Sequence, residues 1–305
     1  MIDRTIEAEL LKFLRPEQIL FDALMSEHTT FKIGGRADLL LLPSSMDEVQ
    51  KIFQTLNEHK IPFTILGNGS NVLVSDKGIR GAVVKFNGNF SRVELRDSRF
   101  VVASAGAKLK DVSIFAAEHS LTGFEFAVGI PGSVGGAIFM NAGAYGGEMK
   151  NVVSSVRAVS PQGEIFEFDR DALDLDYRHS IFQTNGFAIC EVIFELEIGD
   201  QSAIFETMND FTNRRESKQP LDLPSAGSTF RRPKGYFAGT LIDQTGLKGL
   251  RVGGAMVSTK HAGFVVNADH ATASDVMNLI AEVQRRVFEA HGVQLNPEVR
   301  MIGEK

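Results

Sequence analysis

The stretch GIPGSVGGAIFMNAGAYGG at residues 129–147, the glycine segment, contains seven glycines among its 19 residues, and most of its other side chains are apolar. Glycine destabilises the interior of helices and strands, so this composition predicts a long irregular segment. Its unencumbered backbone amides could approach the phosphates of a ligand closely, beside an apolar ring system. A glycine-rich crossover that packs tightly without a ligand fits the same residues, and composition alone does not separate the two.

A second glycine-rich stretch, GNGSN at residues 67–71, is called the glycine loop and follows residues 61–66, which predict a strand. Successive backbone N–H groups in such a turn can bind an anion, and Ser70 and Asn71 add side-chain donors. Val72 occupies the third glycine position of G-x-G-x-x-G, so the Rossmann fingerprint is incomplete. The loop is therefore either a plain tight turn or an anion site. Two such stretches in one domain favour a dinucleotide ligand.

Hydrophobic periodicity predicts helices and strands along the whole chain. Ser45 and Glu48 match an S-x-x-E capping box, which predicts a helix over residues 46–59 between strands at 37–42 and 61–66. Short alternating runs over residues 81–106 predict a mixed sheet. The remaining expected elements are a helix at 109–119, a hairpin of residues 152–160 and 163–169, a strand at 187–198, and helices at 204–215 and 274–291. A shift in composition near residue 200 predicts a boundary between two domains.

Composition excludes several classes of protein. The 32 Lys and Arg residues against 38 Asp and Glu residues give a net charge of −6, which argues against a general nucleic-acid binder. Cys190 is the only cysteine, so an intrachain disulfide and a cysteine-rich zinc site are excluded, and a reducing cytosol fits. The seven histidines form no HExxH motif, and we expect no metal. No run of about 18 apolar residues predicts a membrane span, and the P-loop and G-x-S-x-G motifs are absent.

Three further segments combine polar groups that suit anionic ligands. Residues 225–233, SAGSTFRRP, place hydroxyls beside Arg231 and Arg232, whose guanidinium groups can bind phosphate or carboxylate in a bidentate manner. The same segment fits a solvated basic turn. Residues 177–180, YRHS, and residues 297–300, PEVR, are uninformative alone, because single Arg and Glu residues usually belong to exposed ion pairs.

Taken together and in order, these segments resemble the UDP-N-acetylenolpyruvoylglucosamine reductase (MurB) family. The resemblance spans residues 28–303 and rests on residues 28–35, 67–71, 129–136, 177–178, 225–230, 253–258 and 297–300. It implies an α+β fold, with an FAD-binding domain of the vanillyl-alcohol oxidase (PCMH) type at residues 1–200, made of two α+β subdomains at about 1–80 and 81–200. It also implies a C-terminal α+β substrate-binding domain at residues 201–305, whose last strand returns to the active site.

The resemblance also implies roles for individual residues. The non-covalent FAD contacts would be Gly67, Asn68, Gly69, Ser70, Asn71, Gly129, Pro131, Gly132, Ser133, Gly135, Gly136 and Arg300. The catalytic positions would be Arg178, Ser228 and Glu298, and the substrate contacts would be Tyr177, Lys218 and Arg231.

The reaction implied by the resemblance is the NADPH-dependent reduction of UDP-N-acetylglucosamine enolpyruvate to UDP-N-acetylmuramate, a step of peptidoglycan precursor synthesis in the cytoplasm. Hydride would pass from flavin N5 to C3 of the enolpyruvyl group, and Ser228 would give a proton to C2. Arg178 would stabilise the developing negative charge, with Glu298 on the opposite side. We expect a monomer or weak oligomer that binds neither nucleic acid nor membranes.

The chain resembles the shorter class of this family, because only 40 residues separate Arg178 from Lys218 and no tyrosine lies between them. Two other functions remain open from the residues. One is a flavin oxidase of the same fold that acts on an alcohol, and the other is a non-catalytic protein that binds a nucleotide sugar.

Overall fold

The computed structural model describes residue 2 and residues 4–304. The chain forms two compact units, each assembled from three segments. Unit 1 comprises Met1–Phe21, Leu39–Asn68 and Gly81–Arg215, and unit 2 comprises Asp22–Asp38, Gly69–Arg80 and Glu216–Lys305. The expected division at residue 200 into an FAD-binding and a substrate-binding domain stays a prediction, because these units are defined by packing and not by what they bind.

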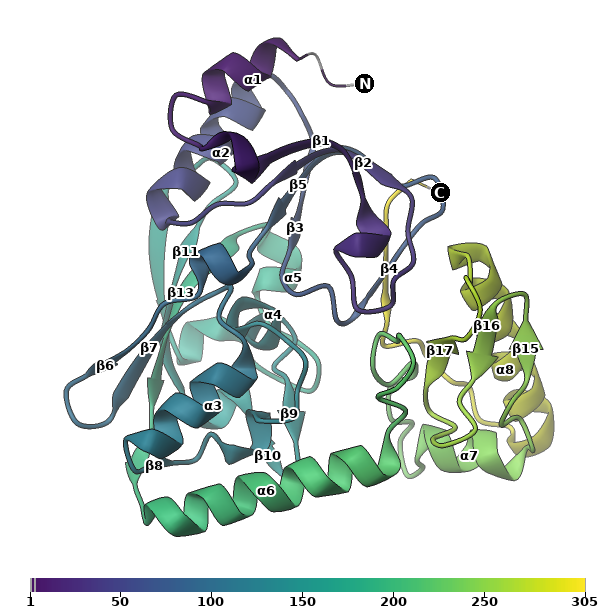
Figure 1. Ribbon diagram of the computed structural model, residues 1–305. Helices are drawn as coiled ribbons and strands as arrows, with labels where there is room; N and C mark the ends of the chain where they lie inside the picture. The colour runs from purple at the N-terminus through teal and green to yellow at the C-terminus, as the bar shows by residue number, and fades with distance from the viewer. Residues whose placement is uncertain (1, 3, 305) are drawn as a thin grey trace. The chain divides into compact units, whose positions relative to one another are not determined.

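The first sheet contains four strands in the order β1-β2-β5-β3 (Figure 1). The strands are β1 (Ile19–Leu24), β2 (Arg36–Leu41), β5 (Ile79–Lys85) and β3 (Phe63–Leu66). Strands β3 and β5 run parallel, which places Leu66 opposite Lys85. The helices α1 (Thr5–Leu10) and α2 (Met46–Glu58) pack against each other. The strands and the helix predicted between residues 37 and 66 are therefore confirmed.

The start of α2 differs in one detail from the predicted capping box. The Ser45 hydroxyl accepts a hydrogen bond from the backbone N–H of Glu48 at 3.2 Å, as expected. The Glu48 carboxylate instead accepts from the backbone N–H and the hydroxyl of Ser44, at 2.7 and 2.8 Å, and from Gln18 Nε2 at 2.7 Å. The glutamate therefore links the start of the helix to the segment before β1.

The second sheet lies in unit 1 and is antiparallel throughout, with the order β12-β11-β13-β7-β6. Its strands are β6 (Val93–Arg96), β7 (Phe100–Ser104), β11 (Val153–Val159), β12 (Ile165–Asp169) and β13 (Ala188–Glu195). The predicted hairpin is confirmed as β11 and β12. The single mixed sheet predicted over residues 81–106 is wrong: β5 belongs to the first sheet, whereas β6 and β7 belong to the second. Alternating hydrophobicity identifies strands but does not identify their partners.

Shorter elements complete unit 1. The helices are α3 (Leu109–Glu118), α4 (Val134–Phe139), α5 (Phe182–Asn185) and α6 (Gln201–Lys218), of which α6 extends into unit 2. The two-residue strands β8 (Leu121–Thr122) and β14 (Glu197–Ile198) pair with each other, as do β9 (Gly143–Ala144) and β10 (Gly147–Glu148). Single 3-10 turns lie at Pro16–Gln18, Met25–Glu27, Gly88–Phe90, Glu125–Ala127, Met149–Asn151 and Asp171–Leu173, the second of them in unit 2. The predicted strand at 187–198 is thus divided into β13 and β14.

The glycine segment is not irregular throughout, which corrects the prediction. It contains α4 and the hairpin of β9 and β10. Glycine is used here for close approach: a Cβ atom at Gly135 would lie 2.9 Å from the Ala105 Cβ, and one at Gly147 would lie 2.5 Å from the Phe126 ring. Close packing outweighs the entropic penalty of glycine in this short helix.

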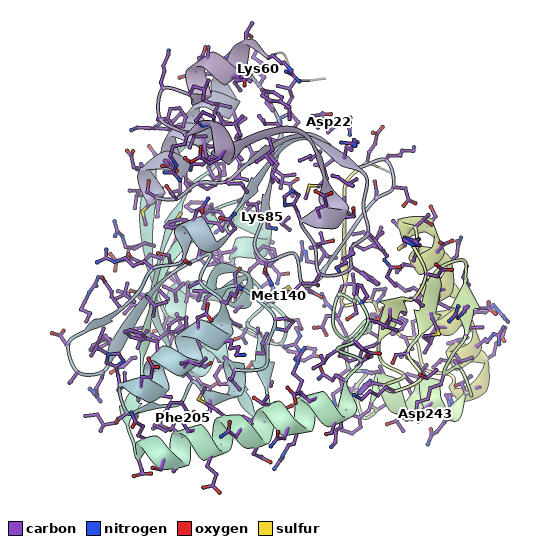
Figure 2. All side chains as sticks on the ribbon, viewed as in Figure 1. Asp22, Lys60, Lys85, Met140, Phe205 and Asp243 are labelled. Carbon is purple, nitrogen blue, oxygen red and sulfur yellow. The ribbon has the colours of Figure 1, made fainter. Side chains whose placement is uncertain are left out.

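Helix α6 packs on unit 1 through a small cluster of buried side chains, Ala117, Val128, Ile204 and Met208. Phe205, labelled in Figure 2, packs against the same cluster from the helix. The predicted helix at 204–215 is confirmed and is longer than expected.

Unit 2 contains a three-stranded antiparallel sheet and two helices, α7 (Ala238–Gln244) and α8 (Ala273–His291). The strands are β15 (Arg251–Val252), β16 (Ala255–Val257) and β17 (Val265–Asn267). Helix α8 begins with a reciprocal capping box between Thr272 and Asp275 and ends at Gly292 with φ of 67°, which confirms the prediction for residues 274–291. The strand β18 (Arg300–Ile302) runs parallel to β4 (Val72–Val74), so the end of the chain returns to the glycine loop.

Two further properties concern the described part of the chain. None of its helices is both long and apolar enough to cross a membrane. Cys190 is fully buried on β13, and burial raises the pKa of its thiol.

Candidate functional site

The glycine loop connects β3 to β4 and has an unusual hydrogen-bonding pattern. Within the described chain, none of its five backbone N–H groups donates a hydrogen bond to another residue. Gly69 has φ of 69°, and a Cβ atom there would lie 2.6 Å from the carbonyl oxygen of His28, so only glycine fits. Consecutive backbone amides without partners are able to bind an anion.

The glycine segment lies next to the first residues of this loop, inside unit 1. Asn68 Nδ2 donates to the carbonyl oxygen of Pro131 at 2.6 Å, and a Cβ atom at Gly67 would lie 2.5 Å from Ser133 Oγ. The structure therefore brings the two predicted glycine stretches together. Ser133 is 2% exposed, and its hydroxyl has no hydrogen-bond partner in the part of the chain that the structure describes. An unsatisfied buried hydroxyl costs about 1–3 kcal/mol, so this position suits a polar ligand group.

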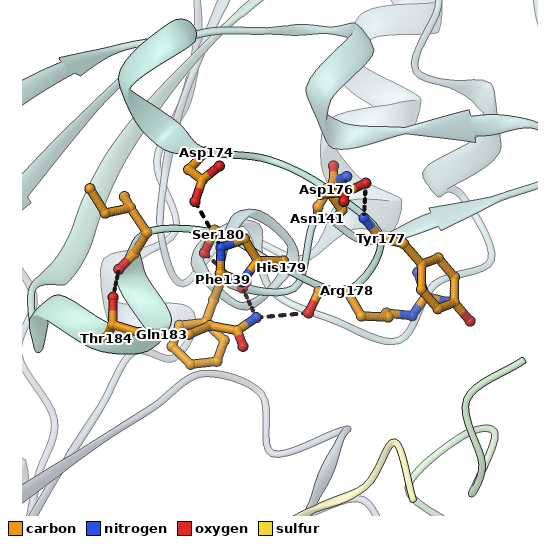
Figure 3. A network of polar contacts seen from close by, with 11 residues as sticks. Phe139, Asn141, Asp174, Asp176, Tyr177, Arg178, His179, Ser180, Gln183 and Thr184 are labelled. Atoms are coloured by element: carbon orange, nitrogen blue, oxygen red, sulfur yellow. Dashed lines mark hydrogen bonds and ion pairs between the residues drawn. The ribbon is translucent and has the colours of Figure 1, made fainter. Parts of the chain in front are cut away.

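Arg178 lies in a tight turn of unit 1 formed by residues 176–179 (Figure 3). Gln183 Nε2 donates to the carbonyl oxygens of Arg178 and Phe139, each at 2.9 Å, and Ser180 Oγ donates to Phe139 O at 2.8 Å. Phe139 is the last residue of α4. These bonds tie the turn that carries Arg178 directly to the helix inside the glycine segment.

The backbone at Arg178 is strained, with φ of 56°. A non-glycine residue in this left-handed region costs about 1–2 kcal/mol and is held there by its surroundings. Asn141 Nδ2 adds a hydrogen bond to Asp176 O at 3.0 Å. The Arg178 guanidinium carbon lies 5.1 Å from the centre of the Tyr177 ring, and Tyr177 is 48% exposed. The turn therefore presents a positioned cation beside an accessible aromatic ring.

Ser228 and Glu298 lie on neighbouring backbone segments of unit 2. The N–H of Glu298 donates to Thr229 O at 2.8 Å, and Arg231 N donates to Asn296 O at 2.8 Å. Thr229 is held in turn by Val265, whose N–H donates to the Thr229 hydroxyl at 2.8 Å. Ser228 is exposed and Glu298 is partly buried. The structure therefore brings together the backbone segments that carry two of the three predicted catalytic residues.

Arg300 joins this part of unit 2 to the glycine loop. Its N–H donates to Asn71 O at 3.0 Å, and Asn71 Nδ2 donates to Glu298 O at 3.4 Å. Burial lowers the pKa of the Arg300 guanidinium, and the positive charge of Arg231 lowers it further. Two cations close enough for one to lower the pKa of the other make this part of unit 2 suited to an anionic ligand.

The other predicted residues are distributed over both units. Gly67, Asn68, residues 129–136, Tyr177 and Arg178 belong to unit 1, whereas Gly69–Asn71, Lys218, Ser228, Arg231, Glu298 and Arg300 belong to unit 2. Lys218 is exposed at the end of α6. Sequence analysis missed Gln183, because it belongs to no recognisable motif. Its role appears only from the hydrogen bonds of its side chain.

Two family models match the chain. An FAD-binding domain matches residues 37–169, and the C-terminal domain of UDP-N-acetylenolpyruvoylglucosamine reductase matches residues 219–302. The UDP-N-acetylenolpyruvoylglucosamine reductase of Clostridium perfringens is 50% identical over 292 residues, which cover 96% of this chain and 95% of that protein. The crystal structure of the Thermus caldophilus enzyme is 34% identical, with a TM-score of 0.78, and covers 92% of this chain and 97% of its own. An alkyldihydroxyacetonephosphate synthase with 18% identity and a TM-score of 0.52, covering 65% of this chain and 41% of its own, shares the fold alone.

These findings define an FAD-binding oxidoreductase with an α+β fold of the vanillyl-alcohol oxidase type. The unpaired backbone amides of Gly67 and Asn68 and the unpaired Ser133 hydroxyl, all in unit 1, are donors of the kind that the diphosphate of this cofactor accepts. Within that class, the chain belongs to the UDP-N-acetylenolpyruvoylglucosamine reductase family.

Proposed function

We propose that this chain reduces UDP-N-acetylglucosamine enolpyruvate to UDP-N-acetylmuramate, with NADPH as the reductant, in the cytoplasm as a step of peptidoglycan precursor synthesis. The observation that carries the proposal is the hydrogen-bonded pairing of the Ser228 and Glu298 segments in a member of this family. Ser228 is exposed and Glu298 is partly buried, and an exposed hydroxyl can give a proton to a substrate carbon.

The cofactor would be held mainly through its diphosphate. In unit 1, the backbone amides of Gly67 and Asn68 and the Ser133 hydroxyl would donate hydrogen bonds to the phosphate oxygens. In unit 2, the amides of Gly69, Ser70 and Asn71 and the charge of Arg300 are the contacts that membership of the family implies. Bound FAD supplies hydride transfer, which no amino-acid side chain provides. Gly129, Pro131, Gly132, Gly135 and Gly136 would keep the backbone of the glycine segment accessible to the cofactor.

Arg178 would stabilise the charge that develops on the substrate. Addition of hydride at C3 of the enolpyruvyl group leaves negative charge at C2 and on the carboxylate, where a guanidinium group can form paired hydrogen bonds. At a separation of 4 Å and an effective dielectric constant of 20, such a pair is worth about 4 kcal/mol. If most of that energy appears in the transition state, Arg178 accelerates the step by about three orders of magnitude. The strained turn and the Gln183 hydrogen bond support this role, because they fix the backbone of Arg178.

Ser228 would donate its hydroxyl proton to C2, and Glu298 would orient the hydroxyl or hold a proton nearby. Tyr177, Lys218 and Arg231 would contact the UDP-sugar, with the two cations facing its diphosphate. Glu298 and Ser228 lie on backbone segments joined by hydrogen bonds, which suits catalysis because proton transfer requires a positioned donor.

The two half-reactions can be followed separately by the absorbance of the flavin. We expect NADPH to bleach the bound flavin rapidly without oxygen, and UDP-N-acetylglucosamine enolpyruvate to restore its colour much faster than air does. Rapid reoxidation by oxygen together with reduction by an alcohol would support a flavin oxidase instead. Protein that stays colourless when FAD is added would support a non-catalytic nucleotide-sugar binder.

A further inference from the structure

Arg215, on the last turns of α6, lies against the backbone of the glycine segment within unit 1. A Cβ atom at Gly129 would lie 3.0 Å from Arg215 Cδ, 3.9 Å from Nε and 4.0 Å from Nη1. The guanidinium group therefore lies along the start of the glycine segment. Glycine at position 129 favours this approach, because a Cβ atom there would require the Arg215 side chain to shift by a few tenths of an ångström.

Arg215 differs from its neighbour in how its charge is neutralised. Arg214 is exposed and forms an ion pair with Asp210 at 2.8 Å. Arg215 is partly buried, and among residues 4–304 no carboxylate forms an ion pair with it. Burial lowers the pKa of its guanidinium group. A partly buried guanidinium group without a carboxylate partner keeps its charge and its donors available to an anion.

The surroundings of Arg215 are arranged like a ligand site. Phe211 lies one turn earlier on the same face of α6, and its ring stacks on Tyr145 with centroids 4.4 Å apart and an angle of 9°. Tyr145 also donates its hydroxyl proton to Phe211 O at 3.1 Å. The N–H and carbonyl groups of Gly129 have no hydrogen-bond partner elsewhere in the described residues. A cation, an unpaired amide and a fixed aromatic pair therefore occur together.

The geometry points to Arg215 as an anion-binding residue that holds phosphate oxygens of a diphosphate ligand, together with the backbone N–H of Gly129. A guanidinium fork and a backbone N–H are the donors that phosphate oxygens accept most readily. Three diphosphates can supply this chemistry: FAD, NADPH and the UDP-sugar. Binding of NADPH or of the UDP-sugar by Arg215 rests on the function proposed above, whereas binding of FAD rests only on membership of the family.

The test is a set of binding measurements on folded protein with three variants of Arg215. Arg215→Ala removes the side chain, Arg215→Met keeps an aliphatic chain without charge, and Arg215→Lys keeps the charge without the fork. Arg214→Ala is the matched control, because it removes a neighbouring arginine that already has a carboxylate partner. Binding of FAD to the apoprotein is measured by flavin fluorescence. Binding of NADP⁺ and of UDP to the holoenzyme is measured by calorimetry.

We expect Arg215→Ala and Arg215→Met to weaken binding of one of these diphosphates by about 10- to 100-fold, Arg215→Lys to weaken it less, and Arg214→Ala to leave it within about twofold. The ligand that is affected identifies the source of the diphosphate. If Arg215→Ala fails to fold, Arg215→Met decides the question. Normal affinity of Arg215→Met for all three ligands overturns the inference. Wild-type protein that binds FAD but neither NADP⁺ nor UDP contradicts the proposed function instead, and leaves the FAD result to decide the role of Arg215.

Discussion

Removal of the Ser133 hydroxyl should stabilise the apoprotein and weaken its binding of FAD, two effects of opposite sign. The hydroxyl is buried and has no hydrogen-bond partner among the described residues. Such a group costs about 1–3 kcal/mol, so Ser133→Ala should raise the free energy of unfolding of the apoprotein by about that amount. This corresponds to an increase in melting temperature of about 2–4 °C per kcal/mol. A hydrogen bond to a charged phosphate is worth about 1.5–3 kcal/mol, so the variant should bind FAD about 10- to 100-fold more weakly.

The assay compares thermal unfolding of the apoprotein and the FAD-bound protein, together with the FAD dissociation constant from flavin fluorescence. Ser113→Ala is the matched control, because Ser113 is equally buried but its hydroxyl donates to Leu109 O at 2.9 Å and contacts Phe124 O at 3.2 Å. That control should destabilise both forms equally and leave the affinity for FAD unchanged. Destabilisation of the apoprotein by Ser133→Ala to the extent seen with Ser113→Ala, or an FAD affinity equal to that of the wild type, would show that the Ser133 hydroxyl does not carry this cost.

Three further predictions concern the backbone, the arginine turn and pH. Gly69→Ala should lower the free energy of unfolding by at least about 1–2 kcal/mol, because φ of Gly69 is 69°. Gly88→Ala is the control and should change it little, because a Cβ atom there meets no atom within 4 Å. Equal effects of the two substitutions in denaturant titrations would contradict this. Gln183→Ala should slow reoxidation of the flavin by substrate, because the substitution removes the hydrogen bond to the carbonyl oxygen of Arg178. Reduction of the flavin by NADPH should stay unchanged in stopped-flow absorbance. Reoxidation at the wild-type rate would show that the turn keeps its conformation without Gln183. A hydrogen bond from the Thr272 backbone lowers the pKa of Asp275, so this carboxylate contributes stability that is present above about pH 4 and lost as the pH falls through its folded pKa. The difference in free energy of unfolding between the wild type and Asp275→Asn should therefore shrink on acidification. A difference that stays constant with pH would contradict this.

The parts of the fold that local sequence determines could be predicted. Ser45 begins α2 and Thr272 begins α8, because a hydroxyl accepts from the backbone N–H three residues later in each helix. The amphipathic pattern of α8 places Val276, Leu279 and Val283 in the core of unit 2. Periodicity and caps are local signals, so one sequence is enough to read them.

The parts that depend on distant contacts could not be predicted. Strand β5 pairs with β3 and not with β6, although all three have similar patterns. The helix α4 lies in a glycine-rich segment, and Gly135 allows it to pack closely against Ala105, which no local propensity encodes. Sheet partners and close backbone approaches depend on residues far apart in the sequence.

The candidate site was predictable in a similar, partial way. Motif order indicated Ser228 and Glu298, and the structure adds the backbone hydrogen bond that joins their segments. The position of Gln183 depends on the carbonyl oxygen of Phe139, and the position of Arg215 depends on Gly129. Each partner lies more than 40 residues away in the sequence. Single polar residues on a helix are common, so only their contacts distinguish them.

The most direct test of the proposed chemistry is stopped-flow absorbance of Ser228→Ala in the two half-reactions. The account predicts that NADPH reduces the bound flavin of the variant at close to the wild-type rate, whereas UDP-N-acetylglucosamine enolpyruvate reoxidises it about three orders of magnitude more slowly. Reoxidation by this substrate at the wild-type rate, or an equal loss in both half-reactions, would contradict the role of Ser228 as the proton donor.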